Sequence, residues 1–168
     1  MGLKIRKLNK NDAVIISQAF SEIGWNKPTL QYENYYSEQC EGKRVVLVAL
    51  LNGKFAGYLT IVWQSGYPYF KENNIPEIMD LNVLPKYRRQ KIATKLMDEA
   101  EKIVSNKSKI IGIGVGLAPG YNAAQRMYVL RGYIPDGLGV TYKGKYVRHG
   151  QKIIANDSLI LYLTKKLK

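Results

Sequence analysis

The junction around Pro85 constrains this chain more than any other part of its sequence. An apolar stretch that reads as a strand ends near Leu84, and Pro85 marks a turn. A helix is predicted from Ile92 to about Val104, because apolar residues recur there at three- and four-residue spacing. The apolar face of this helix consists of Ile92, Ala93, Leu96, Met97, Ala100, Ile103 and Val104.

Positive charge surrounds the start of this predicted helix. Residues 85–97 contain no acidic residue, and they contain five cations, Lys86, Arg88, Arg89, Lys91 and Lys95. Free backbone N–H groups and the helix dipole favour an anion at a helix N-terminus. Open α/β sheets bind ligands where strands end and helices begin. We therefore expect a phosphate-binding loop; the alternative is a solvated basic turn, which charge runs usually are.

Residues 88–93, Arg-Arg-Gln-Lys-Ile-Ala, resemble the acetyl-CoA loop of the GNAT superfamily of N-acetyltransferases. That loop reads Gln/Arg-x-x-Gly-x-Gly/Ala and follows a strand that ends Leu-x-Val-x-Pro, as Leu81, Val83 and Pro85 do here. Lys91 occupies the position of the family's first glycine, and a lysine has less backbone freedom than a glycine. Either Lys91 turns outward and contacts CoA, or the loop is altered. The resemblance implies cofactor contacts by Leu81, Asn82, Val83, Arg88, Arg89, Gln90, Lys91, Ile92, Ala93 and Thr94.

A second segment, residues 122–133, resembles the GNAT pattern Asn-x-x-Ala-x-x-x-Tyr-x-x-x-Gly-Phe, with the alanine shifted. Two such motifs in the expected order give each other the context that a single motif lacks. The resemblance covers about residues 43–135. It implies an α/β fold with a mixed, mostly antiparallel central sheet flanked by helices, and one GNAT-type domain over residues 1–168. It also implies acetyl-CoA as acetyl donor, with no metal.

Acetyl transfer to an amine requires a neutral amine, a polarised thioester carbonyl and a proton for the departing thiolate. By resemblance Tyr128 is the acid, and its ordinary pKa of ~10 suits a leaving thiolate. The alternative is a core aromatic residue. A backbone N–H near Val83 is expected to polarise the carbonyl. Asn122 is expected to cap its helix and, by resemblance, to contact the pantetheine arm.

Glu77 is the base by resemblance, because it lies six residues before Val83 on the strand that leads to the loop. A solvent-facing carboxylate at a strand start is the alternative for Glu77, and water is an alternative base. Asp80 would point to the opposite face of a regular strand, and a β-bulge would change that.

The remaining pattern predicts strands at 2–8, 44–51, 54–63, 75–83, 110–117, 139–147 and 155–164, and helices at 12–23, 29–39 and from 122. Asn52-Gly53 predicts a tight hairpin between two of these strands. Gly112, Gly114 and Gly116 leave one face of a strand bare. Close packing of a helix and room for a ligand backbone both explain such a face.

Composition narrows the class of protein. The 26 Lys and Arg against 13 Asp and Glu give a net charge of +13 over 168 residues. Such a charge attracts CoA phosphates and nucleic acid, but it is dispersed along the chain, so nucleic acid is not favoured. A polycationic acceptor is disfavoured unless acidic residues line its site. The single Cys40 and lone His149 argue against a disulfide, a metal cluster and a Ser-His or Cys-His site.

The sequence thus predicts a cytoplasmic, acetyl-CoA-dependent N-acetyltransferase that acts on a primary amine of a small-molecule or peptide acceptor in a ternary complex. No membrane span is expected, and a homodimer is left open. The alternatives are an aminoacyl-tRNA acetyltransferase of the basic toxin type and a non-catalytic CoA- or nucleic-acid-binding module. Aromatic residues that either line an acceptor pocket or fill the core are Trp25, Tyr32, Tyr35, Tyr36, Trp63, Tyr67, Tyr69, Phe70 and Tyr142.

Overall fold

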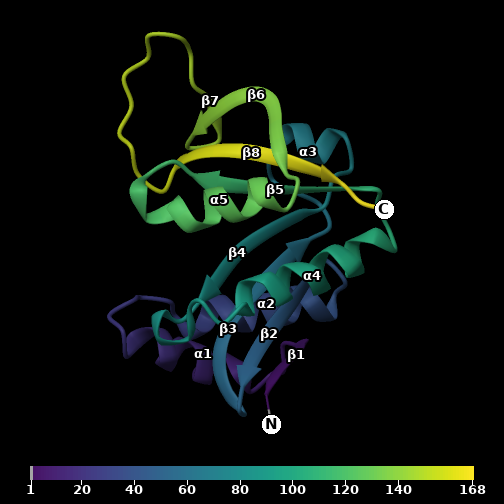
Figure 1. Ribbon diagram of the computed structural model, residues 1–168, viewed down its shortest axis with the longest axis vertical. Helices are drawn as coiled ribbons and strands as arrows, with labels where there is room; N and C mark the ends of the chain where they lie inside the picture. Colours follow the sequence, from purple (N-terminus) through teal and green to yellow (C-terminus); the bar gives the residue numbers. More distant parts are fainter. Residues whose placement is uncertain (1) are drawn as a thin grey trace. The chain divides into compact units, whose positions relative to one another are not determined.

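The computed structural model describes residues 2–168, which form a mixed α/β fold (Figure 1). The chain divides into two compact units. The first unit consists of the residues up to Trp63 together with Ile78–Ile103, and the second of Gln64–Glu77 together with Val104–Lys168. The expectation of one domain over residues 1–168 stays a prediction. No helix among residues 2–168 combines the length and the apolar character needed to cross a membrane.

The first unit is built on four strands in the order β1-β2-β3-β4. Its elements are β1 (Leu3–Lys7), α1 (Asp12–Ser21), α2 (Thr29–Cys40), β2 (Arg44–Leu51), β3 (Lys54–Val62), β4 (Glu77–Val83), the 3-10 turn η1 (Pro85–Tyr87) and α4 (Ile92–Ser105). β1, β2 and β3 pair antiparallel. The predicted hairpin at Asn52-Gly53 is confirmed, since both residues have positive φ as this tight turn requires.

The helices α1 and α2 cover one face of these strands, and α4 covers the other (Figure 1). Val46 and Val48 of β2 pack with Phe20 of α1 and Tyr32 of α2, all nearly inaccessible to solvent. Side chains alternate along a strand, so the buried Val45 and Leu47 point to the opposite face. The apolar stripe predicted from 92 to 104 accounts for the burial of α4, including Leu96, Met97 and Ala100.

An ion pair joins β1 to the first turn of α1. The Arg6 guanidinium donates to both carboxylate oxygens of Asp12, at 2.6 and 2.9 Å, and the Asn9 N–H donates to the same carboxylate at 2.7 Å. Burial raises the pKa of Asp12, but the hydrogen bonds from Arg6 and Asn9 outweigh it and hold that pKa below its ordinary value. The folded state therefore prefers the charged carboxylate.

Asp12→Asn should lower the free energy of unfolding by about 1–3 kcal/mol near neutral pH, because charged hydrogen bonds are lost. The pKa of Asp12 is lower in the folded state. Its contribution is therefore present above the unfolded-state pKa and is lost as pH falls through the folded-state pKa. The difference in the free energy of unfolding between wild type and Asp12→Asn should narrow only below about pH 4. Urea denaturation across pH measures it; Glu33→Gln, at an exposed residue of α2, is the control. A gap independent of pH would contradict this assignment.

The second unit contains the last four strands of the 8-stranded sheet, in the order β5-β8-β6-β7, and the pairs β5-β8, β8-β6 and β6-β7 are antiparallel. Its elements are α3 (Pro68–Glu72), β5 (Ile110–Gly116), the 3-10 turn η2 (Pro119–Tyr121), α5 (Asn122–Leu130), β6 (Ile134–Tyr142), β7 (Lys145–Tyr146) and β8 (Leu159–Lys166). The short helix α3 was not predicted, since five residues give no periodicity to read. The late strands also differ from the prediction: the region 139–147 is split between β6 and β7, and β8 starts at Leu159 rather than at 155.

The glycine face of β5 is closely packed. A Cβ placed on Gly112 would lie 2.3 Å from the Phe70 ring, and one on Gly116 would lie 2.4 Å from the Tyr121 ring. A Cβ on Gly114 would come within 2.9 Å of Ile160. Aromatic and aliphatic side chains therefore fill the space that the glycines leave, and no room remains there for a ligand backbone. The predicted packing of a helix is confirmed at Gly112, which Phe70 of α3 covers, whereas residues of β8 and η2 cover Gly114 and Gly116.

Candidate active site

The end of β4 is fixed in place before the chain turns. Leu84 is 2% exposed, and its N–H donates to the Ala56 carbonyl of β3 at 2.9 Å. η1 follows, in which the Tyr87 N–H donates to the Leu84 carbonyl at 2.9 Å. Strand, turn and helix start thus form the arrangement that the sequence predicts around Pro85.

Two residues of the loop have left-handed backbone angles. Arg89 and Lys91 each have a φ of 60°, a region that only glycine visits at no steric cost. Lys91 therefore keeps the conformation that the glycine of the resembling loop would favour, and its side chain is exposed. This agrees with the outward-facing alternative for Lys91. A contact with CoA stays a prediction.

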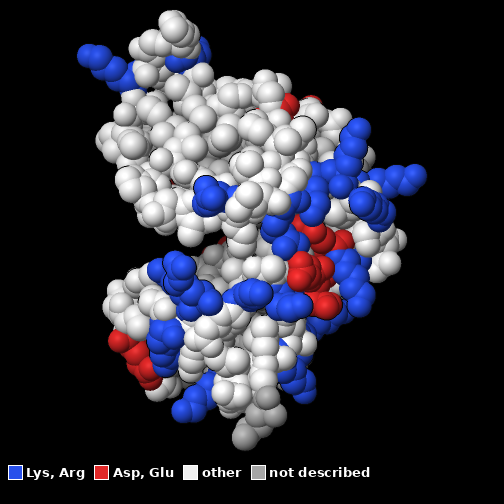
Figure 2. Space-filling model, in the orientation of Figure 1, with Lys and Arg blue, Asp and Glu red and all other residues white. Residues whose placement is uncertain are grey.

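The five cations of the loop are available for an anion. Lys86, Arg88, Arg89, Lys91 and Lys95 are all exposed, and among residues 2–168 none of them is paired with a carboxylate. The Arg88 guanidinium lies 5.9 Å from the centre of the Trp25 ring, and its Nε donates to the Val83 carbonyl at 3.4 Å. Elsewhere the cations are spread out: Lys and Arg cover several areas of the face drawn in Figure 2.

Free backbone donors lie at the same place. The Lys95 N–H donates to the Lys91 carbonyl at 3.0 Å, which is the first hydrogen bond of α4. The N–H groups of Ile92, Ala93 and Thr94 precede it and have no partner within the helix. Ile92 itself is buried, whereas Ala93 and Thr94 are half-buried. Leu81, Asn82 and Val83 are half-buried at the end of β4. Donors and charge together make this junction suited to phosphate.

Lys91→Gly should be about 1 kcal/mol more stable than Lys91→Ala, because only glycine adopts a φ of +60° without a Cβ penalty. Both variants lack the ammonium group, so charge does not separate them. Urea denaturation measures the difference. The same pair of changes at Lys10, which lacks a positive φ, should show the reverse order. Equal stability of the two variants at 91 would mean that the left-handed backbone is not required.

Asp80 interrupts the regularity of β4 and collects hydrogen bonds. Its φ is 54°, so the strand is irregular at this residue. One carboxylate oxygen accepts from Asn82 at 2.8 Å and Lys27 at 3.3 Å; the other accepts from Tyr35 at 3.0 Å, Gln31 at 3.1 Å and the Tyr58 hydroxyl. Five donors fill the lone pairs of the carboxylate. This makes Asp80 a poor candidate for a base.

Besides burial, Asp80 also raises the pKa of the tyrosines that donate hydrogen bonds to it. Burial, followed by the negative charge of Asp80, raises the pKa of both Tyr35 and Tyr58. These phenols therefore stay protonated and act as donors at all ordinary pH values. Tyr58 and Tyr32 are inaccessible to solvent, so the core interpretation of Tyr32 is correct.

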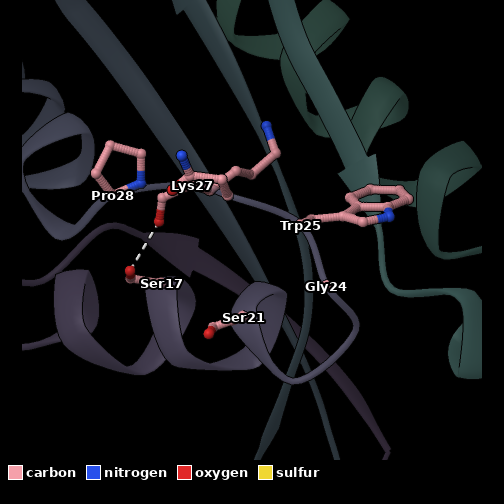
Figure 3. A pocket seen from close by; sticks show the side chains of 7 residues that line it. Ser17, Ser21, Gly24, Trp25, Lys27 and Pro28 are labelled. Atoms are coloured by element: carbon pink, nitrogen blue, oxygen red, sulfur yellow. Dashed lines mark hydrogen bonds between the residues drawn. The ribbon is translucent and has the colours of Figure 1, made fainter.

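A cavity of about 290 Å³ lies beside this cluster, between α1 and the segment that leads to α2 (Figure 3). The hydroxyl of Ser17 donates to the Lys27 carbonyl at 2.7 Å, while the Lys27 ammonium points away from the serines. Trp25 is 37% exposed and stacks on Phe20 with 5.7 Å between ring centres. The cavity is lined by Ser17, Ser21, Gly24, Trp25, Asn26, Lys27 and Pro28.

Glu77 is the first residue of β4, but it belongs to the second unit, and it is buried. It is 5% exposed, and it accepts a hydrogen bond from the Ser65 hydroxyl. The Tyr67 N–H donates to the same hydroxyl at 3.0 Å. The interpretation of Glu77 as a solvent-facing carboxylate is therefore wrong. Ser65 was not predicted, because it lies twelve residues earlier in the chain and no sequence pattern pairs the two.

Tyr128 and Asn122 also lie in the second unit, on α5. Tyr128 is 5% exposed, its ring centre lies 6.1 Å from that of Tyr133, and burial raises its pKa to about 12. It therefore keeps its proton at neutral pH, which suits an acid and suits a core residue equally. The predicted helix cap at Asn122 is wrong. α5 already includes Asn122, because η2 turns the chain before it, and the Asn122 side chain accepts from the Ala123 N–H at 2.6 Å.

Comparison with known proteins adds to this geometry. The sequence profile of the acetyltransferase (GNAT) family matches residues 12–133. No curated protein matches the sequence.

Solved structures share the fold. The yncA protein of Salmonella typhimurium, determined with its cofactor acetyl-CoA, is 18% identical with a TM-score of 0.71, covering 100% of this chain and 95% of that one. The paiA N-acetyltransferase of Thermoplasma acidophilum, in complex with coenzyme A, is 17% identical with a TM-score of 0.67, covering 99% of both. A ribosomal-protein-alanine N-acetyltransferase of Brucella melitensis is 18% identical with a TM-score of 0.70, covering 98% and 99%.

Proposed function

Because the chain belongs to the acetyltransferase (GNAT) family, we propose that it transfers the acetyl group of acetyl-CoA directly to a primary amine in a ternary complex. Acetyl-CoA supplies the activated acetyl thioester, and two similar proteins were determined with acetyl-CoA or coenzyme A. The proposal does not depend on a metal. Among residues 2–168, no three His, Cys, Asp or Glu side chains are grouped so as to hold one.

The junction between β4 and α4 carries this proposal. It combines unpaired helix N–H groups, five exposed cations and left-handed backbone angles at Arg89 and Lys91. Such a junction neutralises the pyrophosphate of a CoA molecule, and Arg88 and Arg89 would bind it. The backbone of Leu81 and Val83 would pair with the pantetheine arm as an added strand does. Asn122 would contact the same arm.

The proposed reaction uses two side chains of the second unit. The amine nitrogen bonds to the acetyl carbon as the carbon–sulfur bond breaks. Glu77, directly or through water, takes the amine proton, and Tyr128 donates a proton to the thiolate that leaves. The hydrogen bond from Ser65 holds the Glu77 carboxylate. The raised pKa of Tyr128 keeps its hydroxyl protonated until it is needed.

Acetyl-CoA should bind the purified protein at micromolar concentration, as measured by isothermal titration calorimetry. Arg88→Ala combined with Arg89→Ala should raise the dissociation constant at least tenfold, since each charged hydrogen bond is worth about 1.5–3 kcal/mol. The control variant, Lys4→Ala with Lys10→Ala, removes the same charge from exposed residues outside the loop. It should change the dissociation constant of acetyl-CoA less than threefold, because salt screens distant surface charges.

Loss of acetyl-CoA binding in both double variants would mean that binding depends on net charge and not on the residues of the loop. In that case, or if wild type fails to bind acetyl-CoA, the acetyltransferase assignment of the loop is wrong.

Tyr128→Phe should lower kcat by about 10²-fold and leave the dissociation constant of acetyl-CoA unchanged, since a general acid contributes to the chemical step alone. The measurement is release of CoA thiol with a panel of primary amines. Because burial raises the pKa of Tyr128 to about 12, the wild-type rate should not fall between pH 8 and 10 through loss of this acid. Tyr133→Phe, at the neighbouring buried ring, is the control. Wild-type turnover in Tyr128→Phe would remove Tyr128 from the mechanism.

A further inference from the structure

A cluster of tyrosines and carboxylates in the second unit is not used fully by the proposed reaction. It consists of Tyr67, Asp136, Tyr146, Tyr162 and Glu77, and is called here the Tyr67 cluster. The Tyr67 hydroxyl donates to Asp136 at 2.7 Å and lies 3.1 Å from the Tyr146 hydroxyl. The Tyr67 ring stacks on the Tyr162 ring with 3.7 Å between centres and 4° between planes. Rings and carboxylate are thereby held in fixed positions.

A bulge in β6 directs Asp136 toward the cluster. The register of β6 against β8 shifts between Pro135 and Val140, and Gly137 and Gly139 both have positive φ. The Leu138 N–H donates to the other carboxylate oxygen of Asp136 at 2.9 Å. β-bulges re-aim side chains and are common beside functional sites.

Among residues 2–168, Asp136 has no cation partner. Although the net charge is +13, no Lys or Arg of the described residues pairs with this half-buried carboxylate. Its field reaches the neighbouring rings: burial, then the charges of Glu77 and Asp136, raise the pKa of Tyr162 to about 12. The electrostatic potential at the rings of the Tyr67 cluster is therefore negative, although the protein as a whole is basic.

The first unit contains the same groups with a cation in place. The Lys27 ammonium lies 3.3 Å from Asp80 and 3.2 Å from the Tyr58 hydroxyl. It also lies over the rings of Phe20 and Tyr58, at 5.4 and 5.8 Å from their centres. Carboxylate, phenol and ring faces together hold a primary ammonium there. The Tyr67 cluster offers carboxylate, phenols and rings without a lysine.

An unpaired hydroxyl lies on the same face of the sheet. Thr141 is 1% exposed, and its Oγ1 has no hydrogen-bond partner in the described part of the chain. Thr141 is opposite Tyr146 on β7 and Ile160 on β8. Residues paired across antiparallel strands, and residues two apart on one strand, point to the same face. Thr141 therefore shares a face with Tyr146 and Tyr162, and offers an unused acceptor to a ligand with N–H donors.

We propose that the Tyr67 cluster binds the ammonium group of a cationic primary amine, and that such an amine is the acceptor. The second part rests on the proposed function, whereas ammonium binding does not. Asp136 supplies the opposite charge, the hydroxyls accept N–H donors, and the exposed ring of Tyr146, 46% accessible, supplies a π face. A primary amine is an ammonium ion at neutral pH. Glu77, in the same cluster, is the group that removes its proton in the proposed reaction.

The first test is direct binding of n-butylammonium chloride, with n-butanol as an uncharged probe of similar shape. Protein labelled with ¹³C at the tyrosine Cζ atoms reports binding by chemical shift, and Tyr→Phe variants assign the signals. Butylammonium should shift the signals of Tyr67, Tyr146 and Tyr162 at a concentration at least tenfold below that of butanol. Equal binding of the two probes would overturn the proposal, because charge would then play no part.

Two pairs of variants make the test specific. Asp136→Asn should weaken butylammonium binding at least tenfold, since the carboxylate charge is lost while the shape is kept. Asp157→Asn should change it less than twofold, although Asp157 also accepts from a tyrosine, Tyr121, at 2.8 Å. Tyr146→Leu should weaken binding about fivefold and Tyr146→Phe less than twofold, as a π contact requires. Tyr146 is exposed, so Tyr146→Leu should not disturb folding. Unchanged butylammonium binding in Asp136→Asn or in Tyr146→Leu would overturn the assignment of the Tyr67 cluster as an ammonium site.

The same variants separate this inference from the proposed function. Calorimetry with acetyl-CoA should give wild-type dissociation constants for Asp136→Asn and Tyr146→Leu. In acetyl transfer to butylamine both should raise KM for the amine more than they lower kcat. Failure of acetyl-CoA to bind wild type would remove the proposed function and the acceptor role, while the butylammonium titration still decides whether the cluster is an ammonium site.

Discussion

The strand-to-helix turn after β4 is the constraint on which the rest of the candidate site depends. Leu84 is buried and hydrogen-bonded to Ala56, so β4 must end there. The chain reaches Ile92 only through left-handed angles at Arg89 and Lys91. These angles cost about 1–2 kcal/mol each for residues with a Cβ. The cost is accepted where unpaired helix N–H groups and exposed cations gather, which is the arrangement that phosphate requires.

Two carboxylates show how position decides the role of one chemical group. Asp80 accepts five hydrogen bonds, one of them from Lys27, and is satisfied within its own unit. Asp136 accepts from Tyr67 and Leu138 and meets no cation among the described residues. A carboxylate whose lone pairs are filled stabilises the fold. One that faces phenols and ring surfaces without a counter-charge can recognise a cation from solution.

This contrast bears on the acceptor. The high net charge argues against a polycationic acceptor when only composition is known. Local groups matter more than net charge at contact distance, because salt screens charges farther than about 8–10 Å apart. In our proposal, Asp136 and Glu77 beside the stacked tyrosines attract an ammonium group to the Tyr67 cluster although the protein as a whole is positively charged.

The sequence by itself determined the elements with strong local signals. Periodic apolar residues specified α4, Asn52-Gly53 specified the hairpin, and Pro85 specified the turn between β4 and α4. Only the tertiary structure decided that Glu77 is buried against Ser65, that Asp80 is saturated by donors, that aromatic rings fill the glycine face of β5, and that Asp136 meets Tyr67. Tyr67 and Asp136 lie 69 residues apart. Local patterns depend on neighbours within a few residues, whereas such contacts exist only once the strands have paired and the bulge in β6 has set the direction of a side chain.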